Sequence, residues 1–225
     1  FLPRRSHLTA AQRFHELCHP FSSSCTVKTL TPANSAIPCG LFIFTRFPVP
    51  GRTKPRLIPL LGPAGAAQLQ KQMTEHLLTQ FHTIPNLSLQ VHYTGGTLHQ
   101  MYRWLGNNTT LIQQGSGDLG QRLTPALHQG FVSGLRHILI VGSDCPSLTQ
   151  THITEALLKL QTHDLVIGPA TDGGYYLIGL KRLHSILFKD ILWGSDRVLT
   201  QTQSIAHQHH LSTALLTPLS DIDRP

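Results

Sequence analysis

The sequence has 225 residues, of which 40% are hydrophobic and only 13% are charged. This composition excludes a disordered chain, and the 4 cysteines are too few for a disulfide scaffold. Apolar runs such as residues 41–44 are far shorter than the ~20 residues that a membrane-spanning helix needs. Length and composition therefore predict one ordinary globular domain or two small ones, with no membrane span.

The basic residues outnumber the acidic ones, 18 against 11, which gives a formal net charge of +7. They form no continuous run, but Arg46, Arg52, Lys54 and Arg56 gather in one segment rich in Gly and Pro. Such a cluster suits the phosphates of a small molecule as well as a nucleic-acid backbone. The sequence shows neither an aromatic platform nor a helix lined with basic residues, so we expect no nucleic-acid partner.

The first part of the chain, residues 1–36, has no sustained helical or strand period. We expect a loosely structured extension there, with a short helix around residues 10–18, followed by a folded domain at residues 37–225. No apolar stretch with a small-residue cleavage site is present, so a secretory signal is not expected. The cysteines form no Cys-x-x-Cys pair and are interpreted as free thiols, which predicts a reducing, cytoplasmic location.

Beyond residue 37, strand and helix signals alternate. Short apolar or alternating segments predict strands at residues 41–44, 87–93, 110–113, 138–141, 165–167, 175–180 and 214–216. Periodic apolar positions predict helices at residues 63–81, 97–105, 118–131, 149–160 and 193–207. This alternation is typical of parallel βαβ units, so we predict an α/β protein, a three-layer α/β/α sandwich with a mostly parallel central sheet.

The loops that follow the predicted strands carry the candidate chemistry, because open parallel sheets bind ligands at the carboxyl ends of their strands. In the first loop, Gly51 allows close approach of the backbone to a diphosphate, and Lys54 and Arg56 can bind its oxygens. Two later loops each carry one aspartate among small residues, Asp144 and Asp172. Carboxylates ligate Mg²⁺ or Mn²⁺, so these aspartates are candidate metal ligands and catalytic residues.

Each feature also has a purely structural interpretation. Asp144 could form an Asx-turn or cap the helix that follows, and Asp172 could belong to an ordinary tight turn before two glycines. The cationic loop could be a solvated surface, and Tyr175 and Tyr176 could serve only to pack the sheet. The three loops together favour a binding site over these separate interpretations.

Five segments of the sequence together resemble one family: FTRFPVPGRTK at 44–54, GSDCP at 142–146, TDGGYYLIGL at 171–180, WGSDRVL at 193–199 and DID at 221–223. The family is the DUF2064 group of bacterial glycosyltransferase-A-like proteins, also called selenodomain-associated transferase 1. The resemblance covers about residues 37–225. The chain differs from the usual family pattern at Pro55, where Thr is common, and at Gly194-Ser195, where Ser-Thr is usual.

The resemblance implies a GT-A-like fold, that of nucleotide-diphospho-sugar transferases, related to the molybdenum-cofactor and phospholactate guanylyltransferases. It implies that Asp144 is the metal-binding carboxylate and Asp172 an acceptor-side or second metal carboxylate. The residues that it places on the nucleotide and phosphate side are Arg46, Gly51, Lys54, Arg56, Asp118 and Arg122. Those that it places on the acceptor side are Gly173, Gly174, Tyr175, Asp196 and Arg197.

We therefore expect a metal-dependent enzyme that transfers a sugar from a nucleotide-diphospho-sugar to an acceptor that the sequence does not identify. The alternative is a nucleotidyltransferase that joins a nucleoside triphosphate to a phosphorylated small molecule and releases pyrophosphate. A nucleotide-sensing domain without catalysis is a third possibility, since a fold does not fix a function.

Overall fold

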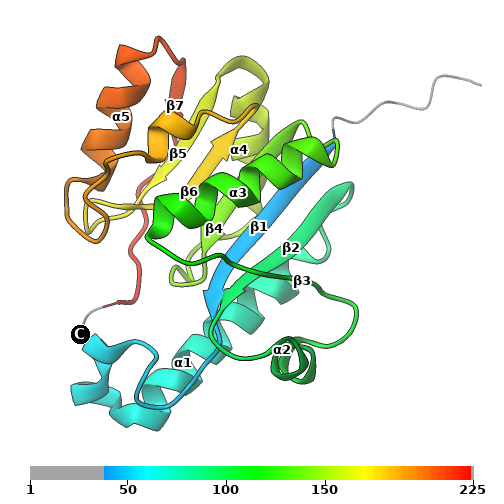
Figure 1. Ribbon diagram of the computed structural model, residues 1–225, viewed down its shortest axis with the longest axis vertical. Coiled ribbons are helices and arrows are strands. Elements are labelled where there is room, and N and C mark those ends of the chain that lie inside the picture. The colour runs from blue at the N-terminus through cyan, green and yellow to red at the C-terminus, as the bar shows by residue number, and fades with distance from the viewer. Residues whose placement is uncertain (1–37, 224–225) are drawn as a thin grey trace, which may run out of the picture. The chain divides into compact units, whose positions relative to one another are not determined.

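The computed structural model describes residues 38–223, which form one sheet with helices on both faces (Figure 1). Its strands are β1 (Cys39–Arg46), β2 (Leu87–Thr94), β3 (Thr110–Gln113), β4 (His137–Gly142), β5 (Leu165–Pro169), β6 (Tyr175–Leu180) and β7 (Thr213–Leu215). Its α-helices are α1 (Ile58–Phe81), α2 (Leu98–Leu105), α3 (Leu119–Val132), α4 (Gln150–Thr162) and α5 (Val198–Gln208). Two short 3₁₀ helices are η1 (Pro55–Leu57) and η2 (Ser185–Phe188). The extension and the helix expected within residues 1–36 lie outside the described residues.

The seven strands lie in the order β3-β2-β1-β4-β6-β5-β7. β6 runs antiparallel to both of its neighbours, and the other adjacent strands pair in parallel. The mostly parallel sheet between two helical layers is therefore confirmed. Because β1 and β4 are parallel neighbours in the middle of the sheet, the loops that follow them start side by side.

The central strands are buried on both faces, which explains their continuous apolar runs. In β1, Leu41 and Ile43 face one core, whereas Phe42 and Phe44 face the other. Side chains of α1, α2 and α4 cover the first face, and those of α3, α5 and η2 cover the second. Figure 1 shows α3 crossing in front of the strands near the middle of the sheet.

Helix boundaries follow local signals, with corrections at α5 and α1. α2 and α3 each begin with a capping box, in which Thr97 pairs with Gln100 and Asp118 with Gln121. The last helix was predicted from residue 193, but α5 begins only at Val198. Gly194 has a φ of +81°, and the Ser195 hydroxyl donates to the Leu192 carbonyl oxygen at 2.7 Å, so this segment is a turn.

α1 also begins earlier than predicted, at Ile58, but Gly62 interrupts it with a φ of +69° and Pro63 starts its regular part. No helix among residues 38–223 is both long and apolar enough to cross a membrane.

Candidate functional site

A cavity of about 560 Å³ opens at the carboxyl ends of β1 and β4. It is lined by the end of β1, the loop before η1, the first turns of α3 and the start of β6. Five of the residues predicted for the site line it, and they are Arg46, Lys54, Arg122, Asp144 and Tyr175. The structure thus brings together groups from four segments that lie far apart in the sequence: the end of β1 with the loop after it, α3, the loop after β4 and the start of β6.

A second cavity, of about 170 Å³, is lined in part by the same residues. Asp144 and Tyr175 line both cavities, while Asp172 and Gly174 line the smaller one. The two predicted carboxylates therefore share a cavity. The Tyr175 side chain packs edge-on against Trp193, and burial raises the pKa of its hydroxyl.

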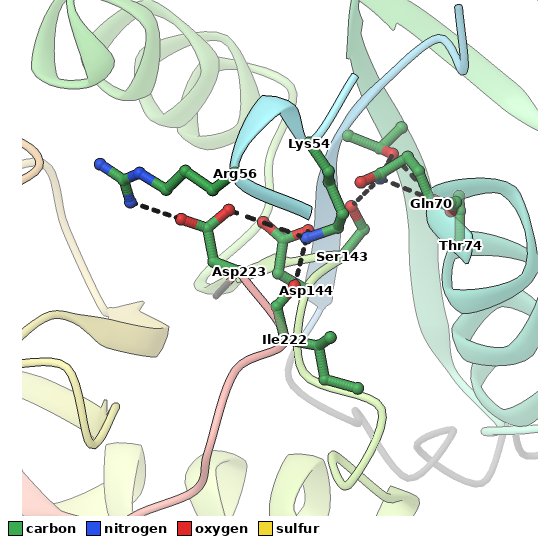
Figure 2. A network of polar contacts seen from close by, with 9 residues as sticks. Lys54, Arg56, Gln70, Thr74, Ser143, Asp144, Ile222 and Asp223 are labelled. Carbon is green, nitrogen blue, oxygen red and sulfur yellow. Dashed lines mark hydrogen bonds and ion pairs between the residues drawn. The ribbon is translucent and has the colours of Figure 1, made fainter. Parts of the chain in front are cut away.

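Lys54 has its charged group inside a shell of oxygen atoms (Figure 2). Its Nζ lies 2.7 Å from Asp144 Oδ1 and 4.0 Å from Asp223 Oδ1, and it donates to the Ile222 carbonyl oxygen at 2.5 Å. The Lys54 side chain is only 4% exposed. This buried ammonium balances the charge of Asp144 and ties the loop after β1 to the end of the chain.

The C-terminal segment, residues 216–223, passes from β7 to the loop before α1 (Figure 1). The Ile222 amide donates to the Asp144 carbonyl oxygen at 2.8 Å, and Arg56 Nη1 pairs with Asp223 Oδ2 at 2.6 Å. Arg56 is exposed and does not line the larger cavity. Sequence reasoning quoted residues 221–223 only for their resemblance and gave them no role, because their partners are distant in the sequence.

Carboxylates gather where the two cavities meet. Burial raises the pKa of Asp221, and the negative charges of Asp172, Asp223 and Asp144 raise it further. Such mutually repelling oxygen donors suit a hard divalent cation such as Mg²⁺ or Mn²⁺. Within residues 38–223, no group of three or more His, Cys, Asp or Glu side chains is already arranged to hold a metal ion. The residues fit a cation that takes one or two carboxylates from the protein and completes its shell with phosphate and water.

Cationic side chains, among them Arg46 and Arg122, also line the larger cavity. Arg122 donates to Gln114 Oε1 at 2.9 Å through Nη1 and to the Asp118 carbonyl oxygen at 3.1 Å through Nε. Burial and the nearby charge of Arg46 lower the pKa of Arg122. In the described part of the chain, neither Arg46 nor Arg122 has a carboxylate within 4.0 Å. Their positive charge is therefore available to an anionic ligand.

Other predicted residues lie outside the two cavities. Gly51 forms a turn with a φ of +79°, and the Asp118 carboxylate accepts the Gln121 amide at 2.8 Å as the cap of α3. Gly173 has a φ of +91°, and a Cβ there would lie 2.2 Å from the Asp196 carbonyl oxygen. The backbone of Asp196 therefore packs directly on the turn that holds Asp172, whereas the side chains of Asp196 and Arg197 are exposed.

Sequence reasoning missed a buried polar cluster at the base of the larger cavity. Gln70 Nε2 donates to Ser143 Oγ at 2.7 Å, to Thr45 Oγ1 at 3.1 Å and to Thr74 Oγ1 at 3.3 Å. One signal was available: Gln70 and Thr74 are polar residues four apart on the otherwise apolar face of α1.

The fold is that of an α/β protein of the nucleotide-diphospho-sugar transferase type. The crystal structure of a proposed nucleotide-diphospho-sugar transferase from Desulfovibrio desulfuricans G20 is similar, with a TM-score of 0.80 and 29% identity over 84% of each chain. The model of the family described as "Uncharacterized protein conserved in bacteria (DUF2064)" matches residues 77–195. The chain belongs to this family, as its motifs predicted. A comparison with curated proteins gives no match.

More distant structures share the fold. CMP:2-keto-3-deoxy-manno-octonic acid synthetase, complexed with CTP, has a TM-score of 0.54 and 9% identity over 83% of this chain and 93% of its own. Glucosyl-3-phosphoglycerate synthase from Mycobacterium tuberculosis, in complex with Mg²⁺ and UDP, has a TM-score of 0.54 and 10% identity over 83% of this chain and 72% of its own. At these identities the likeness concerns the fold alone.

Proposed function

We propose that this chain is a metal-dependent transferase that takes a sugar from a nucleotide-diphospho-sugar and passes it to an acceptor. One observation carries the proposal: the larger cavity is lined by the carboxylates of Asp144 and Asp223 and also by two arginines, Arg46 and Arg122. In the described part of the chain these arginines have no carboxylate within 4.0 Å. A diphosphate bridged to a divalent cation needs both kinds of charge. The substrate is a small molecule, because the cavity is a bounded depression of about 560 Å³.

Two kinds of residue act on the diphosphate of the donor. Arg46 and Arg122 bind phosphate oxygens, because guanidinium groups match their geometry and stay charged. Asp144 would hold Mg²⁺ or Mn²⁺, with phosphate oxygens and water as the further ligands. When bound, such a cation would neutralise the charge that develops on the leaving diphosphate.

Asp172 lines the smaller cavity together with Gly174 and Tyr175. We assign this cavity to the acceptor. Its carboxylate accepts the amide of Gly174 at 2.9 Å, which fixes its direction. We assign Asp172 the acceptance of the proton that the acceptor hydroxyl loses. Lys54 keeps Asp144 in place and, through Ile222, keeps the C-terminal segment across the site.

Calorimetric binding of UDP, GDP, ADP and dTDP, each with and without Mn²⁺, tests this assignment. Asp144→Asn should abolish the part of the affinity that depends on the cation. Asp190→Asn is the matched control, because Asp190 is exposed, lies outside both cavities and has a positive φ that Asn tolerates. Equal cation dependence in Asp144→Asn and the unchanged chain would exclude Asp144 as a metal ligand.

A further inference from the structure

The buried polar cluster of Thr45, Gln70, Thr74 and Ser143 joins the ends of β1 and β4 to α1. Figure 2 shows Gln70, Thr74 and Ser143 of this cluster. None of its members is more than 6% exposed. Buried hydroxyl and amide groups are costly unless they are hydrogen-bonded, so each proton of the cluster needs an acceptor. The positions of these protons can be assigned from the contacts.

Three of the four side chains have acceptors for their protons. The Thr74 hydroxyl donates to the Gln70 carbonyl oxygen at 3.0 Å. In the 2.9 Å contact between Thr45 Oγ1 and Thr74 Oγ1, the proton therefore comes from Thr45. The Gln70 amide nitrogen donates to Ser143 and to Thr45. Ser143 accepts a hydrogen bond, but among residues 38–223 no side chain or backbone group accepts the proton of its hydroxyl.

Ser143 lines the larger cavity and directly precedes Asp144. Because Gln70 donates to Ser143 Oγ, the Ser143 hydroxyl has to direct its own proton away from Gln70. The ligand proposed for this cavity carries phosphate oxygens, which are strong hydrogen-bond acceptors. We propose that the Ser143 hydroxyl donates a hydrogen bond to a phosphate oxygen of the bound nucleotide, and that Gln70 is the positioning residue that orients this donor. The inference rests on the proposed function and deepens it.

Calorimetry tests the inference by measuring the binding of UDP, GDP, ADP, dTDP and inorganic pyrophosphate. The matching nucleosides, which carry no phosphate, are measured for comparison. Ser143→Ala should lower the affinity for the nucleoside diphosphate that binds the unchanged chain by about tenfold or more. This is the loss expected when a hydrogen bond to a charged group is removed. The affinity for the matching nucleoside should not change. Gln70→Leu should lower the affinity for the same diphosphate. The double variant with Ser143→Ala should lose little more affinity than Ser143→Ala alone, because the two residues act as one unit.

Thr74→Val is the matched control, because Thr74 belongs to the cluster but does not line the cavity. It should lower the melting temperature and leave diphosphate affinity within about twofold. The proposal is overturned if Ser143→Ala binds the diphosphate as tightly as the unchanged chain, or loses nucleoside and diphosphate affinity equally. If the unchanged chain binds neither a nucleotide nor pyrophosphate, the proposed function itself fails.

Discussion

Lys54 is the residue on which the geometry of the site depends most. Its ammonium joins Asp144 to the Ile222 carbonyl oxygen. Lys54 and Ile222 are 168 positions apart in the sequence. The sequence predicted that Lys54 binds phosphate directly, and this remains a prediction. The structure adds a second role, the fixing of the carboxylate that would hold the cation.

Lys54→Met keeps the aliphatic part of the side chain and removes its charge. We expect a loss of about 1–2 kcal/mol in the free energy of unfolding, a modest value because Asp144 is 46% exposed. Urea denaturation measures this loss. Lys71→Met is the control, because its 3.8 Å pair with Glu75 lies on the surface and should contribute less than about 0.5 kcal/mol. Equal losses in the two variants would contradict the role given to Lys54.

The burial of His92 indicates how the stability of the fold depends on pH. It is buried against Phe42 and Phe44, and burial lowers its pKa to about 4. Between this value and the usual pKa of 6.5, the unfolded chain binds a proton that the folded chain does not. The folded state should therefore lose up to about 3 kcal/mol from this residue as the pH falls from about 6.5 to about 4.

His92→Phe should flatten this part of the stability profile, measured by urea denaturation at a series of pH values. The exposed His99 provides the control, because His99→Phe removes a histidine that is not buried. A profile as steep in His92→Phe as in the unchanged chain would show that other groups cause the acid sensitivity.

At the scale of elements, the turn between β5 and β6 and the segment before α5 form one unit. The Leu199 amide donates to the Gly173 carbonyl oxygen at 2.9 Å, and the Asp196 backbone occupies the space where a Gly173 side chain would lie. The turn places Asp172 at the smaller cavity. By packing on Gly173, the segment before α5 therefore holds the turn that positions this carboxylate.

The strain of a positive φ alone costs about 1–3 kcal/mol in the free energy of unfolding. Gly173→Ala should therefore lose more stability than this, and it should displace Asp172. Gly194→Ala is the matched control, because Gly194 also has a positive φ but no atom lies within 4 Å of its added Cβ. Thermal unfolding should show the larger loss in Gly173→Ala. Similar losses in the two variants would mean that the close contact with Asp196 is unimportant.

At the scale of the whole molecule, the sequence predicted what local patterns determine. Leu41–Phe44 and residues 138–141 were identifiable as strands because burial on both faces leaves a continuous apolar run. The same topology predicted a cavity at the carboxyl ends of the strands, where the larger cavity lies. The turn at residues 193–197 was misread as helix because apolar periodicity does not register a positive φ at Gly194.

Contacts between residues that are distant in the sequence could not be predicted from local sequence patterns. The hydrogen bond from Gln70 to Ser143 joins residues 73 positions apart, and no local spacing indicates it. The same holds for Lys54 and Asp144, which the sequence assigned to separate tasks. The cap of α3 was accessible, because Asp118 and Gln121 have the spacing of a capping box.

The most direct test of the central claim is a thermal-unfolding panel of nucleoside triphosphates and UDP-, GDP-, ADP- and dTDP-sugars, with and without Mg²⁺ or Mn²⁺. A ligand at ~100 times its dissociation constant adds about 2.7 kcal/mol to the free energy of unfolding. The proposed function predicts a cation-dependent rise in melting temperature with one nucleotide-sugar. A rise with a triphosphate alone would favour nucleotidyl transfer instead, and no rise with any of these ligands would contradict the claim that the cavity binds a nucleotide donor.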